Sequence, residues 1–266
     1  MRYLFVGGSQ RSGTSMLLRL LCSHPTANDV VREASYLRTL MAAYKFGRDD
    51  FENDTRDYFG DLAFFQRFNR TLVESVLLNV ADLQNPNRSQ PIDTLVTKEP
   101  HLTMYFPELH QLLPEAAFVL IARDPRDIIA SMVEVGEKLQ TQGLKHFFQD
   151  RNIKQMSNHL KSFYAPSMNS GDQVFRQSLM TVKYEDLVAD VDAFILKAKE
   201  SFGLDLVNSI AREVDQRAKY EAWSTEQFSR NVNDSSVARY TSVLTADEIR
   251  QAESECSDFM RLFGYQ

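Results

Sequence analysis

Short apolar runs recur along the chain at wide intervals. Four of them are compact and rich in aliphatic, aromatic or β-branched residues, at positions 3–6, 94–97, 117–122 and 179–183. None shows the strict alternation of apolar and polar residues that marks a strand with one side in water. The pattern therefore predicts four strands that are buried on both faces of a parallel sheet.

Longer stretches with helical spacing of apolar residues fill the intervals between these runs. They predict helices over residues 15–23, 33–44, 61–83, 105–113, 126–139, 145–164, 189–202, 207–218 and 246–263. In the helix over 61–83 the stripe expected to be buried comprises Phe65, Phe68, Leu72, Val76 and Val80, with Phe64 beside it. Thr245 followed by Glu248 is a capping box for the last helix. The polar segments 47–53, 85–91 and 225–236 are expected to be loops.

The order of the predicted elements indicates a fold class. Strands that alternate with helices form a doubly wound α/β layer structure, a P-loop-type parallel β-sheet flanked by helices on both faces. No linker composition interrupts the pattern, so residues 1–266 are expected to form a single domain. In such sheets ligands bind beyond the carboxyl ends of the strands. The most distinctive polar motifs follow the first three predicted strands, which places them at that edge.

Composition limits the classes of function. The chain has 266 residues, 43% of them hydrophobic and 25% charged, and a net charge of −6, which argues against bulk nucleic-acid binding. The first predicted strand begins too early for a signal peptide, and no apolar run is long enough to span a membrane. A cytoplasmic protein is therefore expected. Cys22 and Cys256 form no Cys-x-x-Cys pair, so neither a disulfide framework nor a metal–thiolate site is expected.

The segment 7–15, with the sequence GGSQRSGTS, lies between a predicted strand and a predicted helix. Such a turn surrounds an anion with backbone N–H groups. Its spacing matches a P-loop except that Thr14 stands where a lysine would reach the β- and γ-phosphates, and the positive charge is at Arg11 instead. The segment is thus suited to a phosphate-like anion rather than to a magnesium triphosphate. The alternative is a tight turn that needs glycines only for packing.

Two further motifs follow predicted strands. Arg123 comes directly after the run 117–122, and Ser131 lies two helical turns further on, so that a guanidinium and a hydroxyl can converge on a second phosphate. The alternative is an ordinary surface salt bridge between Arg123 and Asp127. Lys98 ends another strand, where it can stabilise an anionic leaving group or be simply an exposed lysine.

These motifs together resemble a known family. The loop 8–15 is similar to the phosphosulfate-binding loop of the sulfotransferases that use 3′-phosphoadenosine-5′-phosphosulfate (PAPS), and Arg123 with Ser131 is similar to their 3′-phosphate motif. More specifically, the chain resembles the tyrosylprotein sulfotransferases and their bacterial relatives. The residues that carry this likeness are His24-Pro25, Arg32-Glu33, Lys98-Glu99-Pro100 and the segments 182–187, 235–240 and 262–265.

The resemblance implies a role for each matching residue. The 5′-phosphosulfate would be held by Arg11, Ser12, Gly13, Thr14 and Ser15. The 3′-phosphate would be held by Arg123 and Ser131, and the nucleotide site would be completed by Tyr184 with Ser236 or Arg239. Lys98 and Arg11 would stabilise the leaving phosphate, and Glu33 would be the general base. No metal is needed, because arginine and lysine supply the positive charge.

The general base is open to alternatives. Many cytosolic sulfotransferases use a histidine, and His101 is the rival to Glu33, with His24 a weaker one. Without the resemblance, Glu33 reads as a helix-start glutamate that the helix dipole favours.

The functional hypotheses fall into three classes. The first is a PAPS-dependent sulfotransferase that acts on a hydroxyl of a glycan, a small molecule or a peptide tyrosine and releases adenosine 3′,5′-bisphosphate. The second is a P-loop kinase or phosphotransferase, and the third a non-catalytic nucleotide-binding protein. The sequence does not choose the acceptor, and it leaves a homodimer open.

Overall fold

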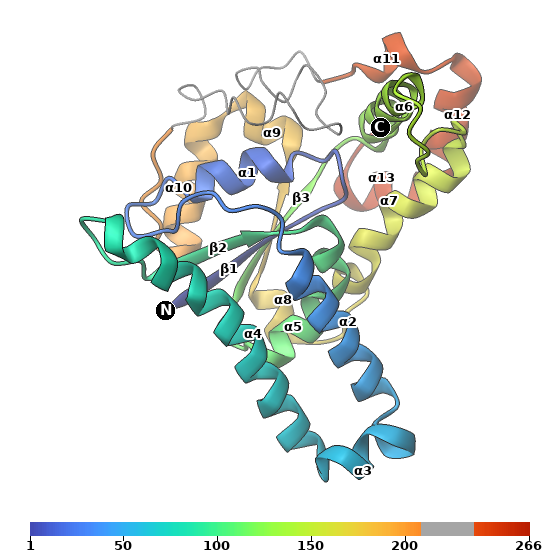
Figure 1. Cartoon of the computed structure of the whole chain (residues 1–266). Coiled ribbons are helices and arrows are strands. Elements are labelled where there is room, and N and C mark those ends of the chain that lie inside the picture. The colour runs from blue at the N-terminus through green and yellow to red at the C-terminus, as the bar shows by residue number, and fades with distance from the viewer. Residues whose placement is uncertain (209–236) are drawn as a thin grey trace.

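The computed structural model describes residues 1–208 and 237–266 of the chain. Its strands form one sheet, β1 (Arg2–Gly7), β2 (Thr94–Lys98), β3 (Ala117–Ala122) and β4 (Leu179–Lys183). The order across the sheet is β2-β1-β3-β4, and every neighbouring pair is parallel (Figure 1). Each predicted strand is confirmed to within one residue at either end.

Helices cover both faces of the sheet because successive strand residues point to opposite sides. In β1, Leu4 and Val6 pack toward α1 (Thr14–Leu21), α9 (Tyr184–Ala189) and α10 (Val191–Phe202). Tyr3 and Phe5 pack the other way, toward α2 (Ser35–Asp49), α4 (Leu62–Gln84) and α5 (Phe106–Leu112). The predicted fold class, a parallel α/β sheet flanked by helices on both faces, is confirmed.

A third hydrophobic cluster lies where β3 meets the C-terminal part of the chain. It joins Leu120 and Ala122 to α6 (Pro125–Thr141), α7 (Ile153–Met168), α12 (Ala246–Glu255) and α13 (Ser257–Phe263). The capping box of Thr245 and Glu248 is present at the start of α12, as predicted. The single helix expected over 246–263 is divided at the buried Cys256, where the backbone leaves helical geometry.

The long helix α4 buries a different face from the predicted one. Its buried residues are Phe65, Asn69, Val73, Leu77 and Ala81. Phe64, Phe68 and Leu72 are 45%, 44% and 37% exposed, so the expected core stripe is wrong at these three positions, whereas Phe65 is buried and Val80 packs partly buried against the core. The face is set by packing against α2, where the rings of Tyr44 and Phe65 stack with centroids 5.6 Å apart.

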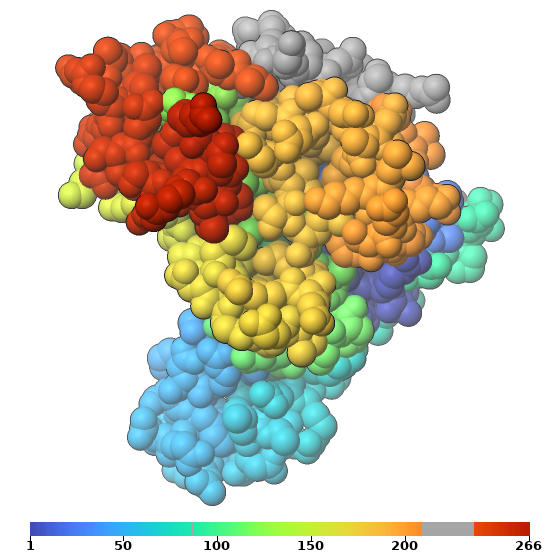
Figure 2. Space-filling model, turned by 180° about the vertical axis from the view of Figure 1, so that it is seen from behind, coloured from blue at the N-terminus to red at the C-terminus, as the bar shows by residue number. Residues whose placement is uncertain are grey.

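The segment between α2 and α4 also departs from prediction. Residues 47–53 were expected to form a loop, but α2 continues to Asp49 and a π-helical turn (Phe51–Thr55) and α3 (Arg56–Phe59) follow. Burial of Phe51 and Thr55 stabilises this compact turn. The α2–α3–α4 unit stands out from the body of the molecule (Figure 2).

Several shorter elements complete the described chain. They are the 3-10 turns η2 (Asn85–Asn87) and η3 (Pro100–Tyr105) and the helices α8 (Gln173–Gln177) and α11 (Tyr240–Val243). The helix expected from residue 145 begins only at Ile153, because the Asn152 side chain caps it by accepting from the Gln155 backbone N–H. Residues 209–236 lie outside the described residues. They include all but the first two residues of the helix expected over 207–218 and the whole loop expected over 225–236. Within the described ranges no helix is both long and apolar enough to cross a bilayer.

Candidate functional site

The predicted site residues gather at one edge of the sheet. Because all four strands are parallel, their carboxyl ends lie on the same side of the molecule. The loop 8–13 leaves this edge after β1, and Lys98 is the last residue of β2, paired in register with Val6. Arg123 directly follows β3 and Tyr184 directly follows β4. Each strand therefore delivers one candidate group to the edge.

The loop from β1 to α1 has an unusual backbone. Gly8, Arg11 and Gly13 have φ values of 141°, 71° and 102°. A Cβ atom at Gly8 would lie 2.6 Å from the Ile121 carbonyl oxygen, and one at Gly13 would lie 2.6 Å from the Tyr184 ring. Glycine is thus required at both positions, by conformation and by space. Arg11 adopts the left-handed conformation with a side chain, which costs about 1–2 kcal/mol.

Neighbouring elements hold this loop in shape. The Gly8 N–H donates to the Thr103 hydroxyl (2.9 Å), and the Ser9 N–H donates to the Tyr164 hydroxyl (3.1 Å). The Ser12 hydroxyl and backbone N–H both donate to the Ser9 carbonyl, at 2.7 and 3.2 Å, and Ser12 is fully buried. The donors of Ser12 are therefore directed into the loop itself rather than outward.

Gly13, Thr14 and Ser15 lie at the start of α1. Gly13 is the N-cap residue, and Thr14 begins the helix. The first N–H groups of an α-helix have no partner inside it and carry the positive end of the helix dipole. These residues therefore present backbone donors suited to an anion at the carboxyl edge of the sheet.

Arg11 links the loop to α6. Its Nε donates to the Ser131 hydroxyl at 2.9 Å, a contact that was not predicted, because Ser131 was paired with Arg123. Burial, together with the nearby positive charge of Arg123, lowers the pKa of Arg11 to about 10. A site that places two guanidinium groups so close is favourable to a multiply charged anion.

Arg123 is buried at the centre of the same cluster. One of its Nη atoms donates to the Arg11 carbonyl at 3.1 Å, and its guanidinium lies 4.5 Å from the centre of the Tyr184 ring. The Asp127 carboxylate lies 3.9 Å from its other Nη atom. The salt bridge considered from the sequence thus exists, but both partners are buried and it is not a surface pair.

Lys98 and Glu33 form an ion pair beside the loop. The Lys98 Nζ donates to the Glu33 Oε1 at 2.6 Å. The Lys98 side chain is 8% exposed and that of Glu33 is 50% exposed. Glu33 was predicted to begin a helix, but α2 starts at Ser35. Glu33 instead lies in the segment just before α2. A hydrogen bond from the Ala34 N–H to the Lys98 carbonyl holds this segment beside the end of β2.

His101, the rival candidate for the base, is oriented by a buried carboxylate. Glu99 is 3% exposed, and its Oε2 accepts a hydrogen bond of 2.6 Å from the Leu102 N–H. Its Oε1 lies 3.1 Å from the His101 Nδ1. The imidazole packs against the Phe163 ring at 5.1 Å. This pairing leaves Nε2 as the ring nitrogen that faces away from Glu99.

The two remaining candidates lie late in the chain. Ser236 falls outside the described residues. Arg239 is described, and its side chain is hydrogen-bonded to Glu134 of α6. Burial raises the pKa of Glu134. The structure therefore places Arg239 beside α6, on the same helix surface that carries Ser131.

Sequence reasoning missed the part that three residues play in the site, and it considered a fourth, Asp127, only as a surface partner of Arg123. Thr103 and Tyr164 hold the loop, Glu99 orients His101, and Asp127 faces Arg123. Asp127 had a visible signal, since it stands four residues after Arg123 on one helix face. The other three act through tertiary contacts across at least 90 residues or through a local turn, for which a single sequence carries no pattern.

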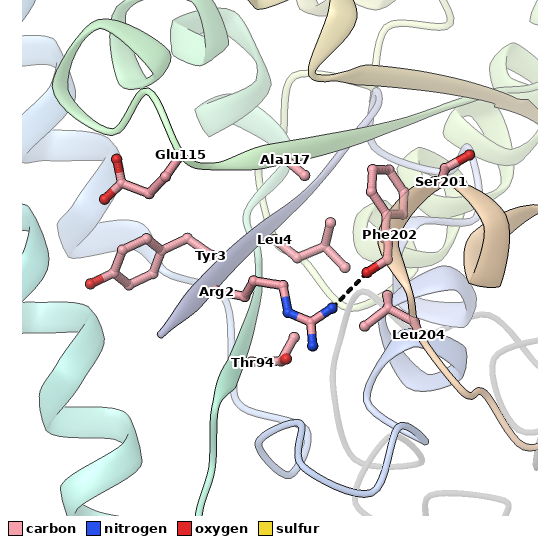
Figure 3. A pocket seen from close by; sticks show the side chains of 9 residues that line it. All are labelled: Arg2, Tyr3, Leu4, Thr94, Glu115, Ala117, Ser201, Phe202 and Leu204. Atoms are coloured by element: carbon pink, nitrogen blue, oxygen red, sulfur yellow. Dashed lines mark hydrogen bonds between the residues drawn. The ribbon is translucent and has the colours of Figure 1, made fainter.

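A cavity of about 230 Å³ opens at the opposite edge of the sheet. Arg2, Thr94 and Ala117 line it at the amino ends of the strands, and Arg2 donates to the Phe202 carbonyl across it (Figure 3). It contains none of the predicted site residues. Within residues 1–208 and 237–266 no group of three or more His, Cys, Asp or Glu side chains is arranged to hold a metal ion.

The sheet order, the glycine-dependent loop at the end of β1 and the basic cluster beside it define a class of protein: a parallel α/β protein with a P-loop-type anion site. Residues 4–208 match the sequence profile described as the Sulfotransferase family. The chain therefore belongs to the sulfotransferase family.

Individual relatives agree with this assignment. A putative protein-tyrosine sulfotransferase of Caenorhabditis briggsae is 21% identical over 98% of this chain and 88% of its own length. The nodulation protein NoeE of Sinorhizobium fredii is 32% identical over 48% of this chain and 30% of its own length.

Solved structures share the fold. The sulfotransferase domain of the Synechococcus PCC 7002 olefin synthase aligns over 100% of this chain and 95% of its own, with a TM-score of 0.58 and 16% identity. A mouse sulfotransferase, SULT7A1, in complex with adenosine 3′,5′-bisphosphate (PAP) aligns over 98% of this chain and 85% of its own, with a TM-score of 0.51 and 12% identity.

Proposed function

We propose that this protein transfers the sulfuryl group of PAPS to a hydroxyl acceptor and releases PAP. The observation that carries the proposal is the meeting of Arg11, Ser131 and Arg123 between the loop and α6. Two guanidinium groups and a hydroxyl there suit two phosphate groups of one nucleotide. The mouse relative that was solved with PAP supports the same ligand.

The residues present fit such a nucleotide. Gly13 lets the ring of Tyr184, a candidate for completing the nucleotide site, pack directly against the start of α1, because a Cβ atom there would lie 2.6 Å from that ring. Arg11 and the first N–H groups of α1 would hold the 5′-phosphosulfate, and Arg123 with Ser131 the 3′-phosphate. PAPS supplies an activated sulfuryl group whose bond to the leaving phosphate breaks as the bond to the acceptor oxygen forms.

Glu33 and Lys98 would act on the two ends of this transfer. Glu33 would take the proton of the acceptor hydroxyl, and Lys98 and Arg11 would stabilise negative charge on the departing phosphate. Their ion pair of 2.6 Å supports the placement of both groups at one reaction centre. Lys98 must exchange its contact with Glu33 for the phosphate, which leaves the carboxylate available as the base.

A second base is supported by one specific contact. The buried Glu99 carboxylate beside the His101 Nδ1 favours the tautomer in which Nε2 is unprotonated and can accept a proton. Glu33→Gln and His101→Asn, assayed for kcat from about pH 5 to 9, separate the two. We expect Glu33→Gln to lower kcat by about 100-fold or more and His101→Asn to change it little. The opposite result would move the role to His101.

The acceptor is proposed to carry its hydroxyl on a peptide tyrosine, as the name of the Caenorhabditis briggsae relative suggests for that protein. Glycans and small alcohols are the alternatives. A screen with labelled PAPS against a tyrosine peptide, its phenylalanine counterpart and an oligosaccharide tests this choice. Label on the oligosaccharide alone would exclude a tyrosine acceptor.

Binding of PAP is the first test of the function. Calorimetry is expected to show PAP binding without a metal in the wild type and a large loss in Arg123→Ala. Glu248→Gln is a suitable control, because Glu248 binds Arg151 away from the nucleotide site. Binding of magnesium ATP but not PAP would favour the phosphotransferase alternative. Binding of PAP without any transfer would favour a non-catalytic nucleotide-binding protein.

A further inference from the structure

Asp127, in the first turn of α6, is buried to 2% exposure and uses both of its carboxylate oxygens. Oδ2 accepts from the Ala238 N–H and Oδ1 accepts from the Tyr240 N–H, each at 2.9 Å. Burial raises the pKa of this carboxyl, so keeping it ionised costs free energy of desolvation. The two N–H groups and the positive charge of Arg123 offset that cost.

The backbone that Asp127 binds is itself constrained. Ala238 has a φ of 57°, a left-handed conformation that a residue with a side chain keeps only when its surroundings impose it. The two hydrogen bonds are made by Ala238 and Tyr240, the neighbours of Arg239 in the chain. They therefore fix the backbone that carries the Arg239 side chain. The guanidinium of Arg126, next to Asp127, lies 4.5 Å from the centre of the Tyr240 ring. This contact also stabilises the turn.

One carboxylate therefore sets the position of two arginines from distant parts of the chain. It faces Arg123 at 3.9 Å, directly after β3, and it fixes the turn that carries Arg239. Arg123 is a candidate for the 3′-phosphate and Arg239 is a candidate for completing the nucleotide site, so the spacing of the two arginines affects how well the nucleotide is held.

We propose that Asp127 is a positioning residue for recognition of the nucleotide's 3′-phosphate. It places Arg123 and the 238–240 turn relative to one another without touching the nucleotide. This inference rests on the proposed function, because the 3′-phosphate is the group that Arg123 would hold there. A merely structural tether of the C-terminal segment would give no preference between nucleotides with and without that phosphate.

The test compares PAP with adenosine 5′-monophosphate (AMP), which lacks the 3′-phosphate. Asp127→Asn keeps the shape of the side chain but replaces one acceptor oxygen with a donor that faces an N–H group. We expect its Kd for PAP to rise by about tenfold while its Kd for AMP stays within about twofold of the wild type. With PAPS as substrate, KM should rise in the same proportion and kcat should change little.

Glu248→Gln is the matched control. Glu248 accepts from Arg151 at 2.6 Å, and Arg151 also donates to the Val243 carbonyl, so this pair tethers the same C-terminal segment away from Arg123. The control should leave the Kd for PAP unchanged. Equal weakening of PAP and AMP in Asp127→Asn, wild-type affinity in Asp127→Asn, or equal weakening of PAP in both variants would each overturn the proposal.

A measurement on the unaltered protein covers the case in which Asp127→Asn does not fold. Hydrogen exchange of the Ala238 and Tyr240 amides should slow with PAP and not with AMP, because only PAP tightens the Arg123–Asp127–turn contacts. Equal exchange with both nucleotides would overturn the proposal. A wild-type protein that binds no PAP at all would instead contradict the proposed function, which is a separate outcome.

Discussion

Tyr164 offers the sharpest test of how the anion loop is supported. Its hydroxyl is fully buried between two backbone groups, accepting from the Ser9 N–H at 3.1 Å and donating to the Ile121 carbonyl at 2.9 Å. Tyr164→Phe removes one oxygen atom and leaves the ring in its contact with the Phe259 ring, whose centroid is 4.9 Å away. The substitution therefore isolates two hydrogen bonds.

The cost follows from the groups that lose their partner. A buried polar group left unsatisfied costs about 1–3 kcal/mol, so two of them predict a loss of about 2–6 kcal/mol in the free energy of unfolding. For a chain of this size about 2–4 °C of Tm is lost per kcal/mol, which gives a fall of roughly 4–24 °C. Because Ser9 belongs to the loop, the affinity for PAP should fall as well.

Thermal and urea unfolding of Tyr164→Phe measure this cost, with Tyr44→Phe as the control. Tyr44 is equally buried, but its hydroxyl contacts the Gln111 side chain at the longer distance of 3.4 Å. The control should lose less than about 1 kcal/mol. If both variants lose the same small amount, the reasoning that the Tyr164 hydroxyl supports the loop is wrong.

Three further outcomes are expected. Gly13→Ala should destabilise the protein more than Gly143→Ala in urea unfolding, because both have positive φ but only a Cβ at Gly13 meets a tyrosine ring, at 2.6 Å; equal losses would show that the ring moves aside. The hydrogen bond from Arg151 lowers the pKa of Glu248 from 4.5 to about 2. The ionised Glu248 therefore stabilises the folded protein fully above pH 4.5, and this contribution is lost as the pH falls toward 2. Glu248→Gln should therefore flatten the acid side of a plot of Tm against pH, and an unchanged slope would contradict the assignment. Burial raises the pKa of the Cys22 thiol to about 12 and also raises that of Cys256, so mass spectrometry should find both unlabelled by iodoacetamide near pH 8 until urea unfolds the chain; labelling of the folded protein would refute this.

The strands and the anion loop could be predicted from the sequence because their signals are local. An apolar run such as 117–122 can be satisfied only inside a sheet, and the glycines of the loop around Arg11 reflect backbone conformations that other residues avoid. The residues Arg11, Ser131 and Arg123 were found by spacing, and the structure brings them together.

The face of α4 and the supports of the site could not be predicted in the same way. Phe68 and Asn69 are adjacent, and hydrophobicity alone selects Phe68 for the core, but packing against α2 buries Asn69, whose amide donates to the Phe65 carbonyl at 2.8 Å. Tyr164 reaches Ser9 across 155 positions of sequence. Which tyrosine makes such a contact is decided by the path of the whole chain.

The sheet order has a consequence for synthesis on the ribosome. The apolar strand β1 ends at Gly7, yet both of its partners, β2 and β3, begin only at Thr94 and Ala117. At roughly 5–20 residues per second, β1 waits about 5–20 seconds before its first partner has been made. Throughout that interval its backbone groups and its side chains lack the neighbours they have in the native sheet, so the nascent chain is the state most exposed to aggregation and most in need of a chaperone.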